Sequence, residues 1–262
     1  TITWCSMRNL IGSLLILLLF SSCKGVNAMQ KCVDYEYKYD AAKAAYAEGR
    51  YSQASLLIGE VLASLKGTTY GEESLYMLAQ STFNAKDYES AASYFRKYYQ
   101  SYPKGVYVEE SRYKCGYALY MMTPDPRLDQ NSTQDALEEF LNFLDYYPQT
   151  RLKDQTQELI YSLQDKLIEK QYLSAKLYYD LGSYINNCAY GGSNYEACVV
   201  TAQNALRDYP FARPERREAF SIIILRAKYH LAKNSVEEKR VERYRDTIDE
   251  YYAFEHDFPE SE

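Results

Sequence analysis

The sequence predicts an all-α protein, built as a solenoid of about five stacked helical hairpins. Two observations carry this prediction: the motif Glu72-Glu73-Ser74 recurs 37 residues later as Glu109-Glu110-Ser111, and apolar residues fall at helical intervals around it. The 262 residues also include only 11 Gly and 7 Pro, too few for a turn-rich β-sandwich.

A second recurring pattern places an aromatic residue, a small residue three positions on, and a proline twelve positions further. Its copies are Tyr88/Ala91/Pro103, Tyr195/Cys198/Pro210 and Tyr244/Thr247/Pro259, while Ala136/Pro148 keeps only the last spacing. The small residue lets two helices approach closely, and proline cannot continue a helix. Each copy therefore marks the second helix of a hairpin and the place where it ends.

These signals divide the chain into hairpins at 35–66, 69–103, 106–148, 150–210 and 212–258. Each hairpin is amphipathic and must stack on a neighbour to bury its apolar face. Residues 150–185 contain no clear helix breaker, which allows one long helix. The spacing of Ala79, Ala91 and Pro103 resembles the tetratricopeptide repeat (TPR), a resemblance that implies a right-handed solenoid.

The N-terminal residues resemble the targeting signal of a bacterial lipoprotein. An apolar run at 10–20 follows Arg8 and ends at Ser21-Ser22-Cys23, which resembles a lipobox apart from Phe20, where an aliphatic residue is usual. We expect Met7 to be the initiator, residues 1–22 a signal peptide, Cys23 the acylated residue and 23–34 a tether. An ordinary signal peptide or a short membrane anchor are the alternatives.

The composition favours binding over catalysis. The chain has 30 Tyr and 9 Phe but 2 His, and its net charge of −6 argues against nucleic-acid binding. Gly191-Gly192 does not form a phosphate-binding loop, and neither His230 nor His256 has a second metal ligand at a suitable spacing. We therefore expect no enzyme activity, no catalytic residue, no metal and no cofactor.

Several segments resemble the BamD family, the helical-repeat lipoproteins of the β-barrel assembly machinery. They are Leu128–Thr133, Lys166–Tyr172, Ala175–Tyr179 and Leu206–Pro210. The resemblance implies a lipid-anchored scaffold on the periplasmic face of the outer membrane of a Gram-negative bacterium. It also implies N-terminal repeats 1–3 (35–148) that receive unfolded outer-membrane proteins, and C-terminal repeats 4–5 with an extension (149–262) that hold the periplasmic domains of the barrel core subunit.

Two other functions remain open from the residues alone. The same architecture would suit another envelope scaffold, for peptidoglycan or cell-division coordination. A glycan-binding lipoprotein is the third alternative, although such proteins usually display exposed Trp, and the single Trp here precedes Met7.

In stacked hairpins the first helices line the concave surface, where aromatic residues recur at two positions per repeat. The candidate peptide-binding residues are Tyr39, Lys43, Tyr46, Tyr76, Gln80, Phe83, Tyr113, Tyr117 and Tyr120. A tyrosine ring offers contact area, and its hydroxyl can bond a peptide backbone. The alternative role for these rings is packing between hairpins.

Export would also permit disulfides. Cys188 and Cys198 flank a glycine-containing turn and could pair, but Cys198 also occupies a position that favours a small buried side chain, so a buried free thiol is the alternative.

Overall fold

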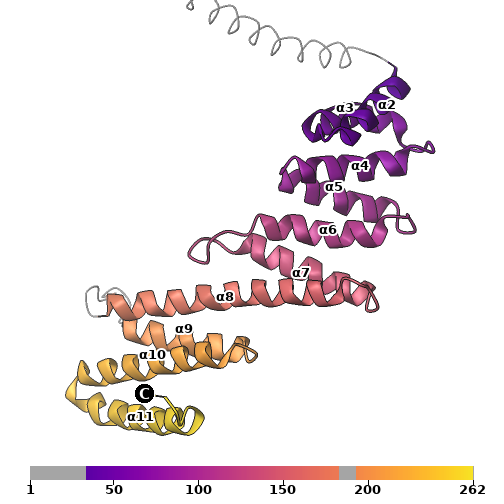
Figure 1. Ribbon diagram of the computed structural model, residues 1–262. Helices are drawn as coiled ribbons and strands as arrows, with labels where there is room; N and C mark the ends of the chain where they lie inside the picture. Colours follow the sequence, from indigo (N-terminus) through magenta and orange to yellow (C-terminus); the bar gives the residue numbers. More distant parts are fainter. Residues whose placement is uncertain (1–33, 183–192, 262) are drawn as a thin grey trace, which may run out of the picture. The chain divides into compact units, whose positions relative to one another are not determined.

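The computed structural model describes residues 34–182 and 193–261, and every regular element in these residues is a helix (Figure 1). In chain order the helices are α2 (Tyr35–Ala47), α3 (Tyr51–Leu65), α4 (Gly71–Asn84), α5 (Tyr88–Ser101), α6 (Val108–Met121), α7 (Asn131–Tyr146), α8 (Lys153–Leu181), α9 (Asn194–Asp208), α10 (Pro214–Lys233) and α11 (Glu237–Asp257).

The ten described helices form five consecutive pairs, and the pairs coincide with the five predicted hairpins. From α2 to α6 each helix packs on the next one along the chain, and α9, α10 and α11 do the same. The prediction of an all-α protein of five helical hairpins is thus confirmed. The predicted single helix in the fourth hairpin is α8, which is 29 residues long.

Proline ends the second helix of several hairpins in a common way. Tyr102, Tyr209 and Phe258 each precede a proline, and their φ and ψ angles are almost the same: −127° and 67°, −124° and 63°, and −134° and 65°. Residues before proline are driven out of the helical region by contact with the proline ring. Each backbone N–H still donates to the carbonyl four residues earlier, so the helix closes its last turn and then stops.

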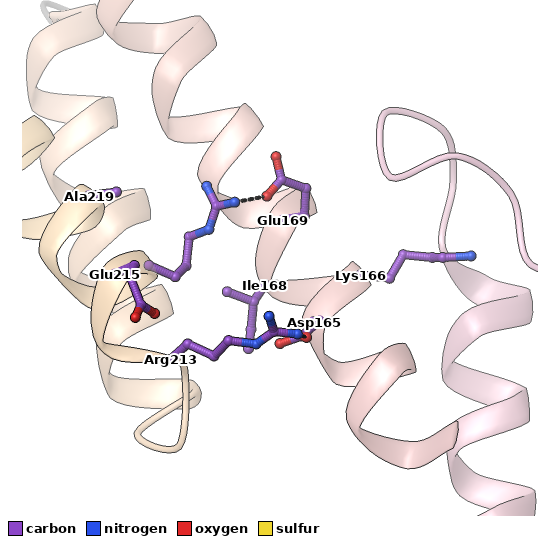
Figure 2. Close-up of a pocket in the computed structure, with 8 residues that line it drawn as sticks. Asp165, Lys166, Ile168, Glu169, Arg213, Glu215 and Ala219 are labelled. Carbon is purple, nitrogen blue, oxygen red and sulfur yellow. Dashed lines mark hydrogen bonds and ion pairs between the residues drawn. The ribbon is translucent and has the colours of Figure 1, made fainter. Parts of the chain in front are cut away.

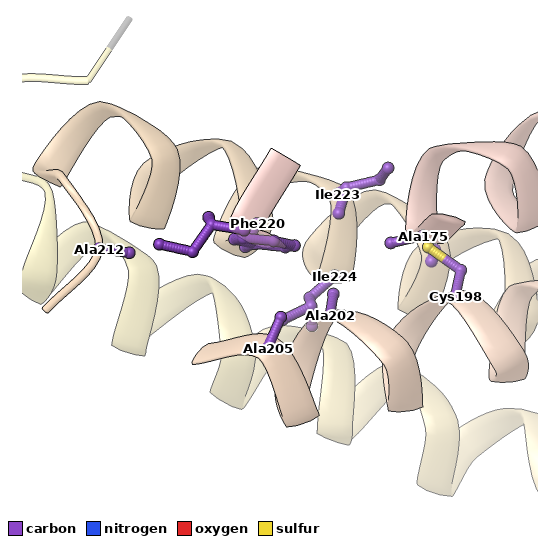
Figure 3. Close-up of a cluster of buried hydrophobic side chains, with 10 residues drawn as sticks. Ala175, Cys198, Ala202, Ala205, Ala212, Phe220, Ile223 and Ile224 are labelled. Atoms are coloured by element: carbon purple, nitrogen blue, oxygen red, sulfur yellow. The ribbon is translucent and has the colours of Figure 1, made fainter. Parts of the chain in front are cut away.

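The small residues of the recurring pattern are all buried. Ala91, Ala136 and Cys198 have no exposed surface, and Thr247 retains 8%. In the C-terminal hairpins, small side chains let α8, α9 and α10 meet around Phe220 and Ile224, as Figure 3 shows. Close packing of this kind accounts for the small side chain at this position of the pattern.

The chain forms two compact units. The first comprises residues 34–123 and 135–153, and the second comprises residues 124–134 and 154–261. The candidate peptide-binding residues all belong to the first unit. The right-handed winding of the whole solenoid stays a prediction. Across the described helices, none combines the length and apolar character needed to cross a membrane.

Candidate functional site: a tyrosine-rich face on α2, α4 and α6

The nine candidate peptide-binding residues lie on the first helices of three successive hairpins, and we call this set the first-helix face. Three of them are buried: Tyr39, Gln80 and Tyr113. Lys43 is exposed, and the remaining five, Tyr46, Tyr76, Phe83, Tyr117 and Tyr120, are half-buried. Their role in peptide binding stays a prediction.

A hydrogen-bonded cluster joins α2 to α4. The Tyr39 hydroxyl donates to Glu73 at 2.7 Å, and the Lys43 ammonium lies 3.1 Å from the same carboxylate. The hydrogen bond from Tyr39, together with Lys43, holds the pKa of Glu73 below its usual value. Tyr70 covers the Tyr39 ring at a centroid distance of 5.0 Å, so a second tyrosine shields the cluster.

The same arrangement recurs between α4 and α6. Gln80 Nε2 donates to the Tyr76 hydroxyl and, at 3.3 Å, to Glu110, which also pairs with Lys114 at 2.8 Å. Tyr107 stacks on Tyr76 with ring centroids 4.0 Å apart and planes at 8°. Burial, followed by the hydrogen bond to Glu110, raises the pKa of Tyr76.

The two clusters repeat with the period of the sequence. Tyr39, Tyr70 and Glu73 have counterparts 37 residues later in Tyr76, Tyr107 and Glu110. The recurring tyrosine and glutamate therefore meet between one hairpin and the next, where they fix the distance and rotation of adjacent hairpins.

In the third hairpin the tyrosines form a ladder. Tyr113, Tyr117 and Tyr120 lie on successive turns of α6, with neighbouring ring centroids 6.0 Å apart and planes at 12° and 15°. Phe83 of α4 contacts the middle ring at 5.9 Å. The ladder extends the aromatic surface along α6 beyond the hydrogen-bonded clusters.

The Glu72 carboxylate, at the start of α4, holds the connection from α5 to α6 in place. Glu72 Oε1 accepts from the Tyr98 hydroxyl at 2.6 Å and from the Val106 amide at 2.9 Å. The Tyr98 hydroxyl accepts in turn from the Tyr107 amide at 3.1 Å. The loop that carries Tyr107 is therefore held where its ring stacks on Tyr76.

These contacts define what the first-helix face can do. The carboxylates bind tyrosine hydroxyls and lysines of the same face, so their charges are used in holding helices together. The five half-buried rings retain partial solvent exposure, and partly exposed aromatic rings can make stacking and van der Waals contacts. Seven of the nine residues of this face are aromatic.

Glu139 of α7 is a buried carboxylate whose role the sequence pattern did not predict. It accepts from the Tyr99 hydroxyl at 2.8 Å and pairs with Arg96 at 3.2 Å. Arg112 lies between the rings of Tyr99 and Tyr146, 4.2 and 3.8 Å from their centroids. The only signal in the sequence was a charged residue within the apolar pattern of α7.

Of the cysteine predictions, Cys23 and Cys188 lie outside the described residues. Cys198 is fully buried, and burial raises the pKa of its thiol to about 12. Cys198 packs against Ala175 and Ala202 in the core of the second unit (Figure 3).

Two arginines that follow Pro210, Arg213 and Arg216, form ion pairs with carboxylates of α8. Figure 2 shows Arg213 against Asp165, and Arg216 pairs with Glu169. Both carboxylates lie on α8, and all four residues line a pocket of about 700 Å³. The Arg216 guanidinium also lies over the Tyr172 ring, 4.5 Å from its centroid. These arginines connect α10 to α8.

The two histidines, His230 and His256, each contact a neighbouring side chain. His230 stacks on Tyr195 at 5.0 Å, and His256 is exposed beside Asp257. Within residues 34–182 and 193–261, no group of three or more His, Cys, Asp or Glu side chains is arranged to hold a metal ion.

The five hairpins, their buried small residues and their proline-terminated helices define a helical-repeat protein of the TPR type. Comparison with solved structures returns such proteins. TPR-like repeats of a kinesin light chain candidate from Podosopora anserina are 13% identical, cover 86% of this chain and 96% of theirs, and have a TM-score of 0.34. A thermophilic TPR protein of Thermus thermophilus is 16% identical over 86% of this chain and 99% of its own, with a TM-score of 0.33.

A family model described as YfiO, outer membrane lipoprotein, matches residues 33–189, more than half of the chain. The chain therefore belongs to the YfiO family of outer membrane lipoproteins. A relative from Aquifex aeolicus (strain VF5), named as a candidate outer membrane protein assembly factor BamD, is 26% identical over 220 residues, covering 83% of this chain and 68% of the relative. The resemblance to the BamD family found in the sequence is confirmed.

Proposed function

We propose that this protein is a scaffold lipoprotein that helps to assemble and insert β-barrel proteins into the outer membrane. The observation that carries the proposal is the family match over residues 33–189, together with a relative named for outer membrane protein assembly. The protein acts by binding its partners and carries out no chemical reaction.

The first-helix face is the proposed site for substrate. An unfolded barrel strand is an extended chain with alternating apolar side chains, and aromatic targeting residues would stack on the Tyr117 and Tyr120 rings. The half-buried state of these rings supports this role, since each can gain contact area without the hairpins opening.

The proposed attachment is an acyl group on Cys23, which would hold the protein at the periplasmic face of the outer membrane. The lipobox-like run Ser21-Ser22-Cys23 supports this proposal. Several acyl chains on one residue would give stable anchoring, whereas a single chain would bind reversibly.

The proposed partner of repeats 4–5 is the periplasmic part of the barrel core subunit. Support for this partner comes from the family resemblance of Lys166–Tyr172 and Leu206–Pro210.

Two measurements in the native organism test the proposed function. The tagged, membrane-bound protein is captured and its partners are identified by mass spectrometry, and the level of folded outer-membrane barrels is followed while the protein is depleted. We expect recovery of the barrel core subunit and a fall in folded barrels. Normal barrel levels after depletion, with peptidoglycan or division proteins captured instead, would favour the other scaffold function.

A further inference from the structure

A crevice on the first unit, away from the first-helix face, has the character of a small-ligand site. It lies between α3, the start of α4 and α5, and has a volume of about 310 Å³. Its lining consists of Gly59, Leu62, Ala63, Lys66, Gly71, Leu75, Lys97, Ser101 and Tyr102. The volume is at the lower end of the range of about 300–1,000 Å³ typical of small-molecule sites.

The charge in this crevice has one sign. Among the described residues that line it, Lys66 and Lys97 are charged and no carboxylate is present. Glu60, the acidic neighbour of Gly59 on α3, is bound to Lys38 of α2 at 2.7 Å. Two cations at the mouth of a pocket, in a chain with net charge −6, favour an anionic ligand.

The interior of the crevice is apolar. Leu62 and Ala63 of α3 and the largely buried Leu75 of α4 supply aliphatic side chains, and Ser101 and Tyr102 are the uncharged polar residues of the lining. A simple inorganic anion would leave this aliphatic surface unused, whereas an anion that carries one hydrocarbon chain would cover it.

Gly59 leaves open space beside α3 at the crevice. It lies in the interior of α3, where glycine destabilises a helix relative to alanine, and a Cβ atom there would meet nothing within 4 Å. Packing within the chain therefore does not require glycine at this position. Its absent side chain leaves the helix backbone open at the rim of the crevice.

We propose that the α3–α5 crevice binds an anionic single-chain amphiphile of the fatty-acid type. Its hydrocarbon chain lies on Leu62, Ala63 and Leu75, and its carboxylate lies between Lys66 and Lys97. Gly59 allows the chain to pass close to the backbone of α3.

Photolabelling of the full chain in its native membrane tests the proposal. The probe is a decanoate that carries a diazirine on its chain, and labelled peptides are located by mass spectrometry. We expect label in the peptides that carry residues 59–75 and 97–102, displaced by excess decanoate and not by decylamine. Equal displacement by the amine, or displacement only by a peptide with a free C-terminal carboxylate, would overturn the proposal.

Variants separate binding from folding. Lys66→Gln and Lys97→Gln should each weaken the competition by decanoate about tenfold, as expected for the loss of a charge-assisted contact. Lys104→Gln, a lysine outside the crevice, serves as the control. Gly59→Gln should abolish labelling without lowering the unfolding temperature, because Gln is the better helix former; Ser64→Gln on the same helix should leave labelling intact. Unchanged labelling of Gly59→Gln would contradict the assigned site.

Discussion

Gly116 and Gly59 are both helical glycines, yet the structure gives them opposite roles. A Cβ atom at Gly116 would lie 2.9 Å from two ring atoms of Phe140, which is fully buried and cannot withdraw. Gly116→Ala should therefore destabilise the protein by about 1–3 kcal/mol through overpacking. Gly59→Ala should stabilise it by roughly 0.5–1 kcal/mol through helix propensity.

Chemical unfolding of the two variants beside the parent protein measures both changes. They share the same substitution and differ only in surroundings, so each is the control for the other. A stable Gly116→Ala variant would show that α6 and α7 do not approach as closely as the structure has them.

Glu73 makes the first unit sensitive to acid. Its pKa is lowered in the folded chain by the hydrogen bond from Tyr39 and by Lys43, so its contribution to stability is complete above the ordinary value of 4.5 and is lost as the pH falls below it. Because the carboxylate is half exposed, the contribution should be less than about 1 kcal/mol.

Unfolding temperatures measured from pH 7 to pH 3.5 test the contribution of Glu73 to stability. Glu73→Gln should lower the stability at pH 7 and flatten the decline below pH 4.5. Glu138→Gln removes a charge from an exposed position of α7 and should not change the shape of the curve. If both variants decline as the parent does, Glu73 plays no part.

At the scale of the elements, the connection from α5 to α6 depends on the Tyr98 hydroxyl. It donates to Glu72 and accepts from the Tyr107 amide, and the Tyr98 side chain is fully buried. Tyr98→Phe would leave the Tyr107 amide without this acceptor, at an expected cost of about 1–3 kcal/mol.

The destabilisation caused by Tyr98→Phe should be confined to the connection from α5 to α6. Hydrogen exchange should show the amides of Val106 and Tyr107 becoming less protected, while helices α2 and α3 keep their protection. Tyr94→Phe, which removes the hydroxyl of a half-buried neighbour on the same helix, should leave both amides unchanged. Equal loss of protection in the two variants would rule out a specific role for Tyr98.

The helices could be predicted because their ends are encoded locally. A proline removes a donor and restricts the residue before it, so Pro103 and Pro210 end α5 and α9 whatever lies around them. The buried small residues also follow from spacing alone, since helical periodicity fixes which face Ala91 occupies.

The contacts between hairpins could not be predicted in the same way. The meeting of Tyr39 with Glu73 depends on how far one hairpin is rotated against the next, which no local pattern specifies. For the same reason Tyr113 is more buried than the half-buried Tyr117, although both occupy the first-helix face. The pairing of Arg213 and Arg216 with carboxylates of α8 also depends on how helices pack, so the residues around Pro210 do not reveal it.

At the scale of the whole molecule, the chain combines a match to a lipoprotein family with an aromatic surface on its first three hairpins. Its described helices provide aromatic side chains held by tyrosine–glutamate contacts between hairpins, and the match to the YfiO family places it among outer membrane lipoproteins. We propose that a scaffold of this kind works by binding substrate and partner on one chain, since stacked repeats bind over extended surfaces.

Site-specific crosslinking in living cells tests most directly the proposal that the first-helix face receives unfolded outer-membrane proteins. A photoreactive phenylalanine analogue is placed at Tyr117 or Tyr120, whose rings are half-buried and only stack, and at the exposed Tyr161 of α8 as the control. We expect adducts with newly made barrel proteins from the two α6 positions and none from Tyr161. Adducts absent from both α6 positions, or equally strong from Tyr161, would contradict it.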